Sequence, residues 1–191
     1  TRRLRSKVFL SRSQRRLARH VSNRIKSLVR RERPTQALKL LSAKVYRRLN
    51  SVNFDQNLAI IARGYYHAGK DEKALAVATR ATKRSAAKAP YAYWWAGLAA
   101  WRLERYNIAA DHFASMAQAP DLLDWPRAAA AYWPARAALV GKEPAGVAGM
   151  LKIGAQFPYT FYGLLSLQAR DGERPFNWAL PKLGPSELAL L

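Results

Sequence analysis

The chain has 191 residues, half of them apolar, with no cysteine and a formal net charge of +21. This length accommodates one medium-sized domain with a substantial core. The lack of cysteine excludes disulfides and thiolate metal sites but leaves the cellular compartment open. No uncharged apolar run approaches the roughly 20 residues that cross a bilayer. No signal-peptide pattern opens the chain, so we expect any export signal to lie outside it.

Most of the charge lies in the first 54 residues. They hold 17 of the 33 lysines and arginines and a single acid, Glu32, whereas residues 55–191 hold 16 basic and 11 acidic residues. A basic segment of this kind favours anionic partners such as nucleic acid, anionic lipid or an acidic polymer. The alternative interpretation is that these arginines form the solvated face of a helix.

The same segment contains a predicted amphipathic helix. Ser11 and Gln14 are spaced as a capping box, and Pro34 closes the segment. Between them, apolar residues recur at helical spacing, at Leu17, Val21, Ile25, Leu28 and Val29. Arginines occupy much of the remaining surface, so the sequence predicts a helix with one apolar face and a strongly positive outer face.

Three downstream segments share a helix–turn–helix pattern, which indicates an internal repeat. They are ARGYYHAGKDEKALAVATRAT, AGLAAWRLERYNIAADHFASMA and YWPARAALVGKEPAGVAGMLKI. When the three turns are aligned, Gly69, Glu104 and Gly141 fall in register, at spacings of 35 and 37 residues.

Two positions after each turn carry a packing signal. The small residues, five positions after the turn, are Ala74, Ala109 and Gly146. The residues four positions further on are Ala78, Phe113 and Met150, and an earlier, fainter copy places Ala37 and Leu41 at the same two positions. A small residue lets two helices approach closely, and the residue one turn later fills the groove toward the next hairpin. This is the logic of a tetratricopeptide-like hairpin.

Prolines mark the expected helix starts. Pro90 is placed to begin a helix that carries Tyr93, Trp94, Trp95 and Trp101. Pro126 is placed to begin another that carries Tyr132 and Trp133. Pro134 falls inside this second helix and should kink it, because proline removes a backbone donor.

The predicted fold class is all-α, because the sequence lacks sustained apolar/polar alternation and hairpin turn signals. We expect about four helical hairpins and one further helix through FPYTFYGLL, stacked as a right-handed α-solenoid. Residues 1–54 would form a basic helical segment that continues an upstream helical array. Residues 55–172 would form the superhelical domain, and residues 173–191 an irregular strap.

The sequence contains no recognisable catalytic constellation. The histidines His20, His67 and His112 are far apart and lack metal-ligand spacing. The carboxylates considered for sugar chemistry, Asp121, Asp124 and Glu143, lack the apolar surroundings that would tune a general acid. The chain is therefore predicted to carry no active site, no metal and no cofactor.

The aromatic residues suggest either a binding face or a packed core. Flat rings stack well on sugars and bases, but most of these rings occupy helix-packing positions in the repeat register. We assign five of them to the core: Trp94, Trp101, Phe113, Phe161 and Tyr162. In FPYTFYGLL, Gly163 would permit close approach within the final helix pair, and Tyr159 would be more exposed.

Three segments in this order resemble a known family. They are YAYWWAGLAAWRLERYNIAADHFASMA, RAAAAYWPARAAL and GAQFPYTFYGLLSLQARDG, which together resemble the soluble lytic murein transglycosylases of Gram-negative bacteria. The middle signature matches at Arg127, Ala128, Tyr132, Trp133, Arg136 and Ala137, and the last at Phe161, Tyr162, Gly163 and Leu165. Pro134 stands where the family commonly has a small residue. The resemblance covers residues 55–172 well and residues 1–54 only generally.

The resemblance implies a periplasmic, non-catalytic helical scaffold that presents a lysozyme-like catalytic domain to peptidoglycan. In this family one glutamate cleaves the MurNAc–GlcNAc bond without water and leaves a 1,6-anhydro end. The catalytic glutamate would belong to sequence beyond Leu191. The implied partners are glycan strands and the downstream catalytic domain.

A second hypothesis is a tetratricopeptide-like adaptor that binds a protein partner or an acidic polymer through the basic helix. Nucleic acid is the less favoured polymer, because only Phe9 and Tyr46 interleave the arginines before residue 54. The candidate contacts for glycan or another polyanion are Arg127, Arg136, Tyr159, Arg24 and Arg31.

Overall fold

The computed structural model describes residues 11–43 and 49–172, and every regular element in these ranges is helical. The helices are α1 (Arg12–Arg30), α2 (Pro34–Ser42), α3 (Ser51–His67), α4 (Asp71–Ser85), α5 (Pro90–Arg102), α6 (Tyr106–Ala117), α7 (Asp124–Val140), α8 (Val147–Gly154) and α9 (Phe161–Asp171), with a short 3-10 helix η2 (Ala86–Lys88). The predicted all-α class is confirmed. The predicted strap over residues 173–191 lies outside the described residues.

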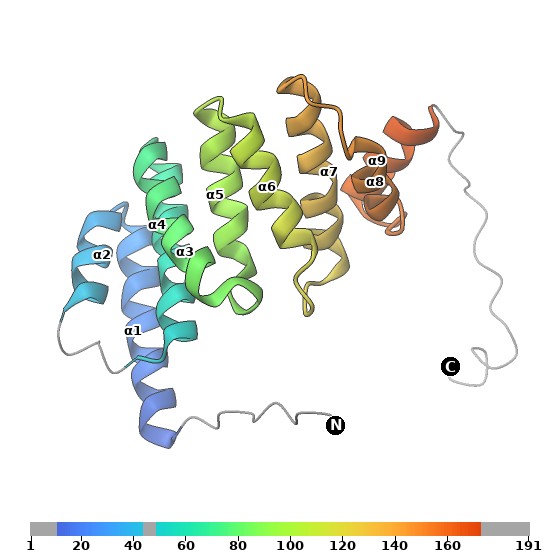
Figure 1. Ribbon diagram of the computed structural model, residues 1–191. Coiled ribbons are helices and arrows are strands. Elements are labelled where there is room, and N and C mark those ends of the chain that lie inside the picture. The colour runs from blue at the N-terminus through green and yellow to red at the C-terminus, as the bar shows by residue number, and fades with distance from the viewer. Residues whose placement is uncertain (1–10, 44–48, 173–191) are drawn as a thin grey trace, which may run out of the picture.

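The helices lie side by side in chain order, from α1 and α2 at one end to α8 and α9 at the other (Figure 1). From α3 to α9 each helix contacts the next one in sequence, and additional contacts join α1 to α3, α3 to α5, and α7 to α9. One hydrophobic cluster extends from Val21 in α1 to Ala137 in α7. The proposed boundary between residues 54 and 55 falls inside α3, so the basic segment shares this core with the downstream helices.

Four turns between paired helices have the same backbone geometry. Each contains one left-handed residue, at Glu32, Gly69, Glu104 and Lys142, with φ values of 58°, 69°, 58° and 60°. In every turn the amide of that residue donates to the carbonyl three residues back. The following amide donates to the carbonyl five residues back. These are Schellman turns, which satisfy the last carbonyls of the preceding helix. They end α1, α3, α5 and α7 in the same way.

The third turn lies one residue further along the chain than the sequence alignment predicts. The left-handed position is Lys142, and Gly141 keeps helical geometry with φ −73°. The packing positions after it shift as well. Gly146 is the exposed, left-handed residue that precedes α8 and does not pack between helices, and Leu151 is buried in place of Met150. The other predicted small residues, Ala37, Ala74 and Ala109, are fully buried.

The left-handed residues give a stability prediction. Glu104 has φ 58°, and a residue with a Cβ is strained there by about 1–2 kcal/mol, whereas glycine is not. We expect Glu104→Gly to raise the free energy of unfolding by about 0.5–1 kcal/mol, measured by urea denaturation. Glu72→Gly, inside the exposed first turn of α4, is the control and should lower stability. A loss of stability in Glu104→Gly would contradict the assignment of this turn.

Polar contacts tie the second turn to the third and the third turn to the fourth. Arg102 bonds to Asp71, and the guanidinium of Arg105 donates to the carboxylate of Glu72 at 2.6 and 3.1 Å. One turn later, the Asn107 amide donates to Glu143 Oε1 at 2.8 Å. The same edge of successive helix pairs is therefore joined by a ladder of charged and amide groups.

The helix starts agree in part with the sequence predictions. The Ser11–Gln14 capping box is present, and Pro90 is the first residue of α5. Pro34 does more than close the basic segment, because it begins α2. α7 begins at Asp124, two residues before Pro126. α7 also continues through Pro134, which is buried; the kink there stays a prediction.

The FPYTFYGLL segment divides into a turn and a helix. Thr160 caps α9, and its side chain accepts the amide of Gly163 at 3.0 Å. A Cβ at Gly163 would lie 1.8 Å from the Phe157 carbonyl oxygen, so the glycine allows the turn to fold against its own helix. The assignment of Phe161 to the core was wrong, because that side chain is 56% exposed. Tyr159 is 87% exposed, as expected.

Candidate functional site

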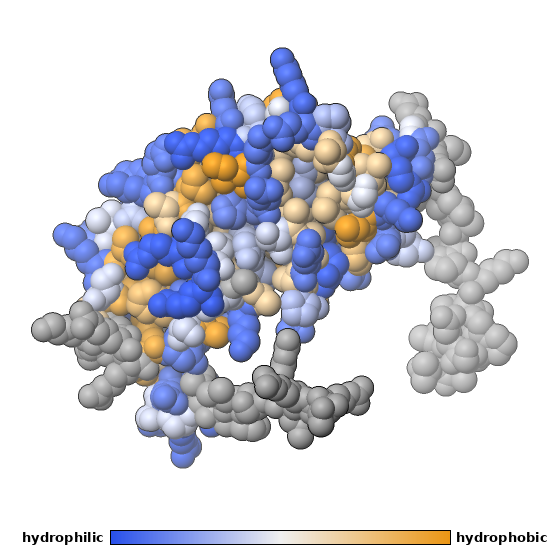
Figure 2. All heavy atoms as spheres, in the orientation of Figure 1, coloured by the Kyte–Doolittle hydropathy of each residue, from blue (hydrophilic) through white to orange (hydrophobic). Residues whose placement is uncertain are grey.

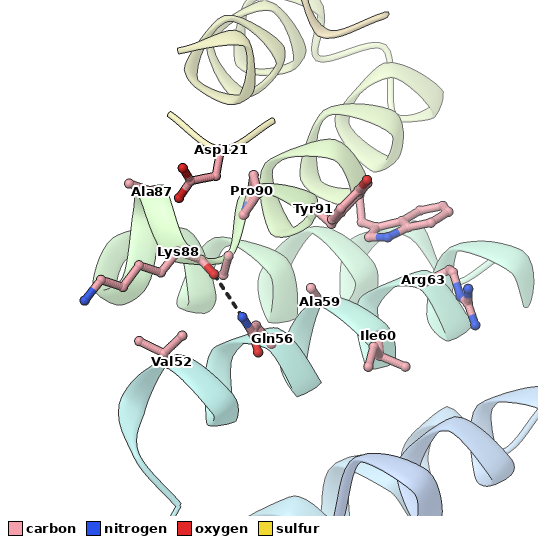
Figure 3. A pocket seen from close by; sticks show the side chains of 12 residues that line it. Val52, Gln56, Ala59, Ile60, Arg63, Ala87, Lys88, Pro90, Tyr91 and Asp121 are labelled. Atoms are coloured by element: carbon pink, nitrogen blue, oxygen red, sulfur yellow. Dashed lines mark hydrogen bonds between the residues drawn. The ribbon is translucent and has the colours of Figure 1, made fainter. Parts of the chain in front are cut away.

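A groove of about 810 Å³ lies between α3 and α5. α3 provides one wall, η2 and the start of α5 provide the other, and the loop before α7 reaches its rim (Figure 3). Its lining residues are Val52, Gln56, Ala59, Ile60, Arg63, Ala87, Lys88, Ala89, Pro90, Tyr91, Trp95 and Asp121. A wide groove with an apolar lining and a few polar groups is typical of a binding site.

The two walls are joined by a hydrogen bond. The Gln56 side chain donates to the Lys88 carbonyl at 3.1 Å, from α3 to the end of η2 (Figure 3). Pro90 begins α5 directly after this contact, which places Tyr91 in the first turn of the helix. The groove therefore depends on the packing of α3 against α5, two helices separated in sequence by a whole helix.

The aromatic part of the groove is held in place by neighbouring rings. Trp95 is half-buried, and its ring centroid lies 5.6 Å from that of Tyr66 and 5.5 Å from that of His67. The Arg102 guanidinium carbon lies 3.7 Å from the Tyr66 centroid, so a cation–π contact helps to hold this ring. Tyr91 is 51% exposed. The groove thus contains the indole ring of Trp95, which is held in place, and the phenol ring of Tyr91, which is accessible.

The polar groups of the groove are suited to binding. Arg63 and Lys88 supply positive charge, and Asp121 is the carboxylate among the lining residues. Two carboxylates at the short or long spacing of a glycosidase would be needed for sugar hydrolysis, and this lining holds one. A ligand with a flat apolar face and a carboxylate or carbonyl group would complement these side chains.

A smaller hollow of about 300 Å³ adjoins the groove. Val29, Arg30, Glu32, Arg63, Gly64, His67 and Ala68 line it, from the end of α1 and the end of α3. Arg63 lines both hollows. The two hollows therefore meet at Arg63, whose side chain lies between them.

The predicted contact residues are not gathered at one place. Arg24 and Arg31 lie on and directly after α1, whereas Arg127 and Arg136 are on α7 and Tyr159 is in the loop before α9 (Figure 1). Arg24, Arg31, Arg136 and Tyr159 are exposed. None of the five lines the groove.

Arg127 has a structural role. Its guanidinium donates to four backbone carbonyls of the α6–α7 connection, those of Ala117, Ala119, Pro120 and Leu122, at 2.9–3.2 Å. The guanidinium N–H groups that make these bonds are the ones that would otherwise donate to a ligand. Arg136 is more accessible, and its guanidinium carbon lies 5.8 Å from the Trp101 ring and 6.0 Å from the Trp133 ring.

Two ionisable side chains are perturbed by burial away from the groove. Burial lowers the pKa of His112, against the opposing effect of the neighbouring Asp111 charge. Burial also raises the pKa of Tyr93, whose ring centroid lies 6.0 Å from that of His112. Among the described residues, no group of three or more histidine, cysteine or acidic side chains is arranged to hold a metal ion.

Sequence reasoning missed the groove residues Arg63, Lys88 and Tyr91. One signal was available: the helix from Pro90 is apolar on nearly every side, from PYAYWWAG onward. A helix of this kind has more apolar surface than one core contact covers, so some of its rings had to face a hollow. No family model, curated protein or solved structure matches the chain.

Proposed function

We propose that the chain is a right-handed α-solenoid of tetratricopeptide-like hairpins that serves as the non-catalytic scaffold of a soluble lytic murein transglycosylase. In this proposal it acts in the periplasm, contacts peptidoglycan glycan strands and supports a catalytic domain of the same protein. That domain would carry out the cleavage that leaves 1,6-anhydro ends. The four Schellman turns, which recur after 35 to 38 residues, support the repeat architecture.

One observation carries the proposal: the three segments of the resemblance pack against each other. Trp94 of the first segment lies 5.3 Å from Phe113 and 6.4 Å from Trp133, by ring centroids. Tyr132 of the second segment lies 5.6 Å from Tyr162 of the third. Residues that define the resemblance in sequence therefore form aromatic contacts that run across α5, α6, α7 and α9, which we refer to as the aromatic spine. These contacts support the interpretation that the three segments belong to one scaffold.

The test is to add purified sacculi to the chain, and separately to the chain joined to the sequence that comes after it in its gene. We expect the chain alone to sediment with sacculi and to release nothing. The joined protein should release muropeptides with 1,6-anhydro ends, detected by mass spectrometry. If the joined protein digests sacculi to reducing ends, or if neither protein binds or digests them, the proposal is wrong.

The groove gives this experiment a matched pair of variants. Tyr91→Ala removes an exposed ring from the groove, and Trp125→Ala removes a 60% exposed ring at the start of α7. If glycan strands occupy the groove, Tyr91→Ala should weaken sedimentation with sacculi by about tenfold, as for loss of one stacking contact. Trp125→Ala should leave it unchanged. Equal effects of the two changes would place the contact elsewhere, with Arg136 and Tyr159 as the next residues to replace.

A second candidate function is an adaptor that binds an extended segment of a protein partner. The observation that favours it is the pair of hollows that share Arg63, which have apolar lining residues and the cations Arg30, Arg63 and Lys88. An acidic peptide would complement these charges. Binding of an acidic peptide that Arg63→Gln abolishes, in a chain that does not sediment with sacculi, would favour the adaptor over the scaffold.

A further inference from the structure

Six of the exposed cations of α1 form a stripe along one flank of the helix, whereas Arg24, which is also exposed, lies on the other flank. At 100° per residue, the stripe spans an arc of about 100° and is centred roughly 130° from the mean direction of the buried residues Val21, Ile25 and Val29. It consists of Arg12, Arg15, Arg16, Arg19, Lys26 and Arg30, all of them exposed. With a rise of 1.5 Å per residue, it extends over roughly 27 Å. We refer to these six residues as the α1 stripe.

The α1 stripe lacks the counter-charges that four arginines elsewhere in the described part of the chain have. Arg84, Arg102, Arg105 and Arg170 each form an ion pair with an aspartate or glutamate. In the described part of the chain, no acidic side chain pairs with a member of the α1 stripe, and Glu32 is the one acid near its end. The fold therefore concentrates positive charge on α1 without neutralising it internally.

The position of α1 leaves the stripe open to a large partner. α1 contacts α2 and α3 through its opposite face. Its first turns extend past the ends of the other helices, and hydrophilic side chains cover that projecting end (Figures 1 and 2). In the described part of the chain every member of the stripe is exposed, so a flat surface can contact several of them at once.

We propose that the α1 stripe binds the phosphate headgroups of an anionic phospholipid surface and so holds the helical array against a membrane. Guanidinium groups form paired hydrogen bonds with phosphate oxygens, and five of the six cations are arginines. Each basic residue near an anionic bilayer contributes about a fivefold gain in binding. This attachment is independent of the function proposed above.

The geometry favours a bilayer over nucleic acid. The stripe contains no aromatic ring, and single strands are held largely by ring stacking on bases. Readout of base edges in a duplex would require α1 to enter a major groove about 12 Å wide, and α2 and α3 pack against α1, with Gly64 of α3 beside Val29 of α1. The apolar face of α1 is committed to the core, so adsorption is electrostatic and involves no insertion into the acyl chains.

The experiment measures co-sedimentation of the 191-residue chain with large vesicles. One set contains phosphatidylglycerol mixed into phosphatidylcholine, and the other contains phosphatidylcholine alone. The stripe variant combines Arg12→Gln, Arg16→Gln, Arg19→Gln and Lys26→Gln. The control variant removes the same charge from exposed positions on α4 and α8, with Lys73→Gln, Arg80→Gln, Lys83→Gln and Lys152→Gln. Glutamine is a good helix former, and circular dichroism verifies that both variants fold.

We expect the unmodified chain to bind the anionic vesicles and not the neutral ones. Binding to the anionic vesicles should be lost at high salt, about 0.5 M. The stripe variant lacks four charges and should bind on the order of several hundredfold more weakly, and the control variant within about fivefold of the unmodified chain. Equal losses in the two variants, or no binding to anionic vesicles, would overturn the proposal. Binding of a short DNA duplex that the stripe variant loses, in a chain that ignores vesicles, would also overturn it and assign the stripe to nucleic acid.

Discussion

Replacing Arg84 with methionine is expected to lower the free energy of unfolding by about 3–5 kcal/mol. The Asp55 carboxylate is fully buried in α3, and it accepts hydrogen bonds from Arg84 Nε at 2.9 Å, from Arg84 Nη2 and from Ser85 Oγ. Arg84 supplies the positive charge in this set. Without it, a buried carboxylate is left with one neutral donor, and that state is strongly unfavourable.

The two partners of this pair are expected to respond unequally. The Arg84 side chain is 51% exposed, whereas that of Asp55 is 0% exposed. Asp55→Asn leaves a cation that water can reach, so we expect a smaller loss of about 1–3 kcal/mol. The double variant Asp55→Leu with Arg84→Met leaves no buried charge and should be more stable than Arg84→Met alone. The Phe54 ring, 4.9 Å from the Arg84 guanidinium carbon, can then pack on the methionine.

Urea denaturation followed by circular dichroism measures these differences. Arg80→Met, at an exposed position on the same helix, is the matched control and should change stability by less than about 0.5 kcal/mol. Equal losses in Arg84→Met and Asp55→Asn would mean that the carboxylate does not require its counter-charge. The raised pKa of Arg84, caused first by its hydrogen bond to Asp55, agrees in direction with a favourable pair.

Local sequence signals were enough to predict most elements of the fold. The capping box at Ser11, the helix start at Pro90 and the buried alanines Ala74 and Ala109 all depend on residues close in sequence. The third turn did not follow from such signals. Glycine favours left-handed geometry, which predicts Gly141 as the turn residue, but the chain uses this glycine for close approach. A Cβ there would lie 3.1 Å from Asn107 Oδ1.

The candidate groove could not be predicted in the same way. Arg63, Lys88 and Tyr91 come from different elements, and they meet only because α3 packs on α5. The hydrogen bonds of Arg127 could not be predicted from the sequence either. An arginine near a loop predicts an exposed charge, but here the loop wraps around the guanidinium with four carbonyls. Loop conformation is set by tertiary contacts, which a repeat register does not contain.

The second large effect is expected at Phe113. This side chain is the largest that is fully buried among the described residues, and its ring lies 5.3 Å from Trp94 and 5.6 Å from Trp133 by centroids. Phe113→Ala would remove the ring from the centre of the aromatic spine and leave a cavity. We expect a loss of about 3–5 kcal/mol in urea denaturation. The matched control is Phe161→Ala, whose ring is 56% exposed, and which should cost less than about 1 kcal/mol.

Gly97 provides a sharper test of the same contact. A Cβ at Gly97 would lie 2.6–2.8 Å from three ring atoms of Phe113, closer than van der Waals contact allows. Gly97→Ala should therefore destabilise the unmodified chain by about 1–3 kcal/mol. In a Phe113→Leu background the obstruction is smaller, and alanine is favoured over glycine inside a helix by about 1 kcal/mol. Gly97→Ala should then become neutral or stabilising. If it is equally destabilising in both backgrounds, α5 and α6 do not meet through this glycine and this ring.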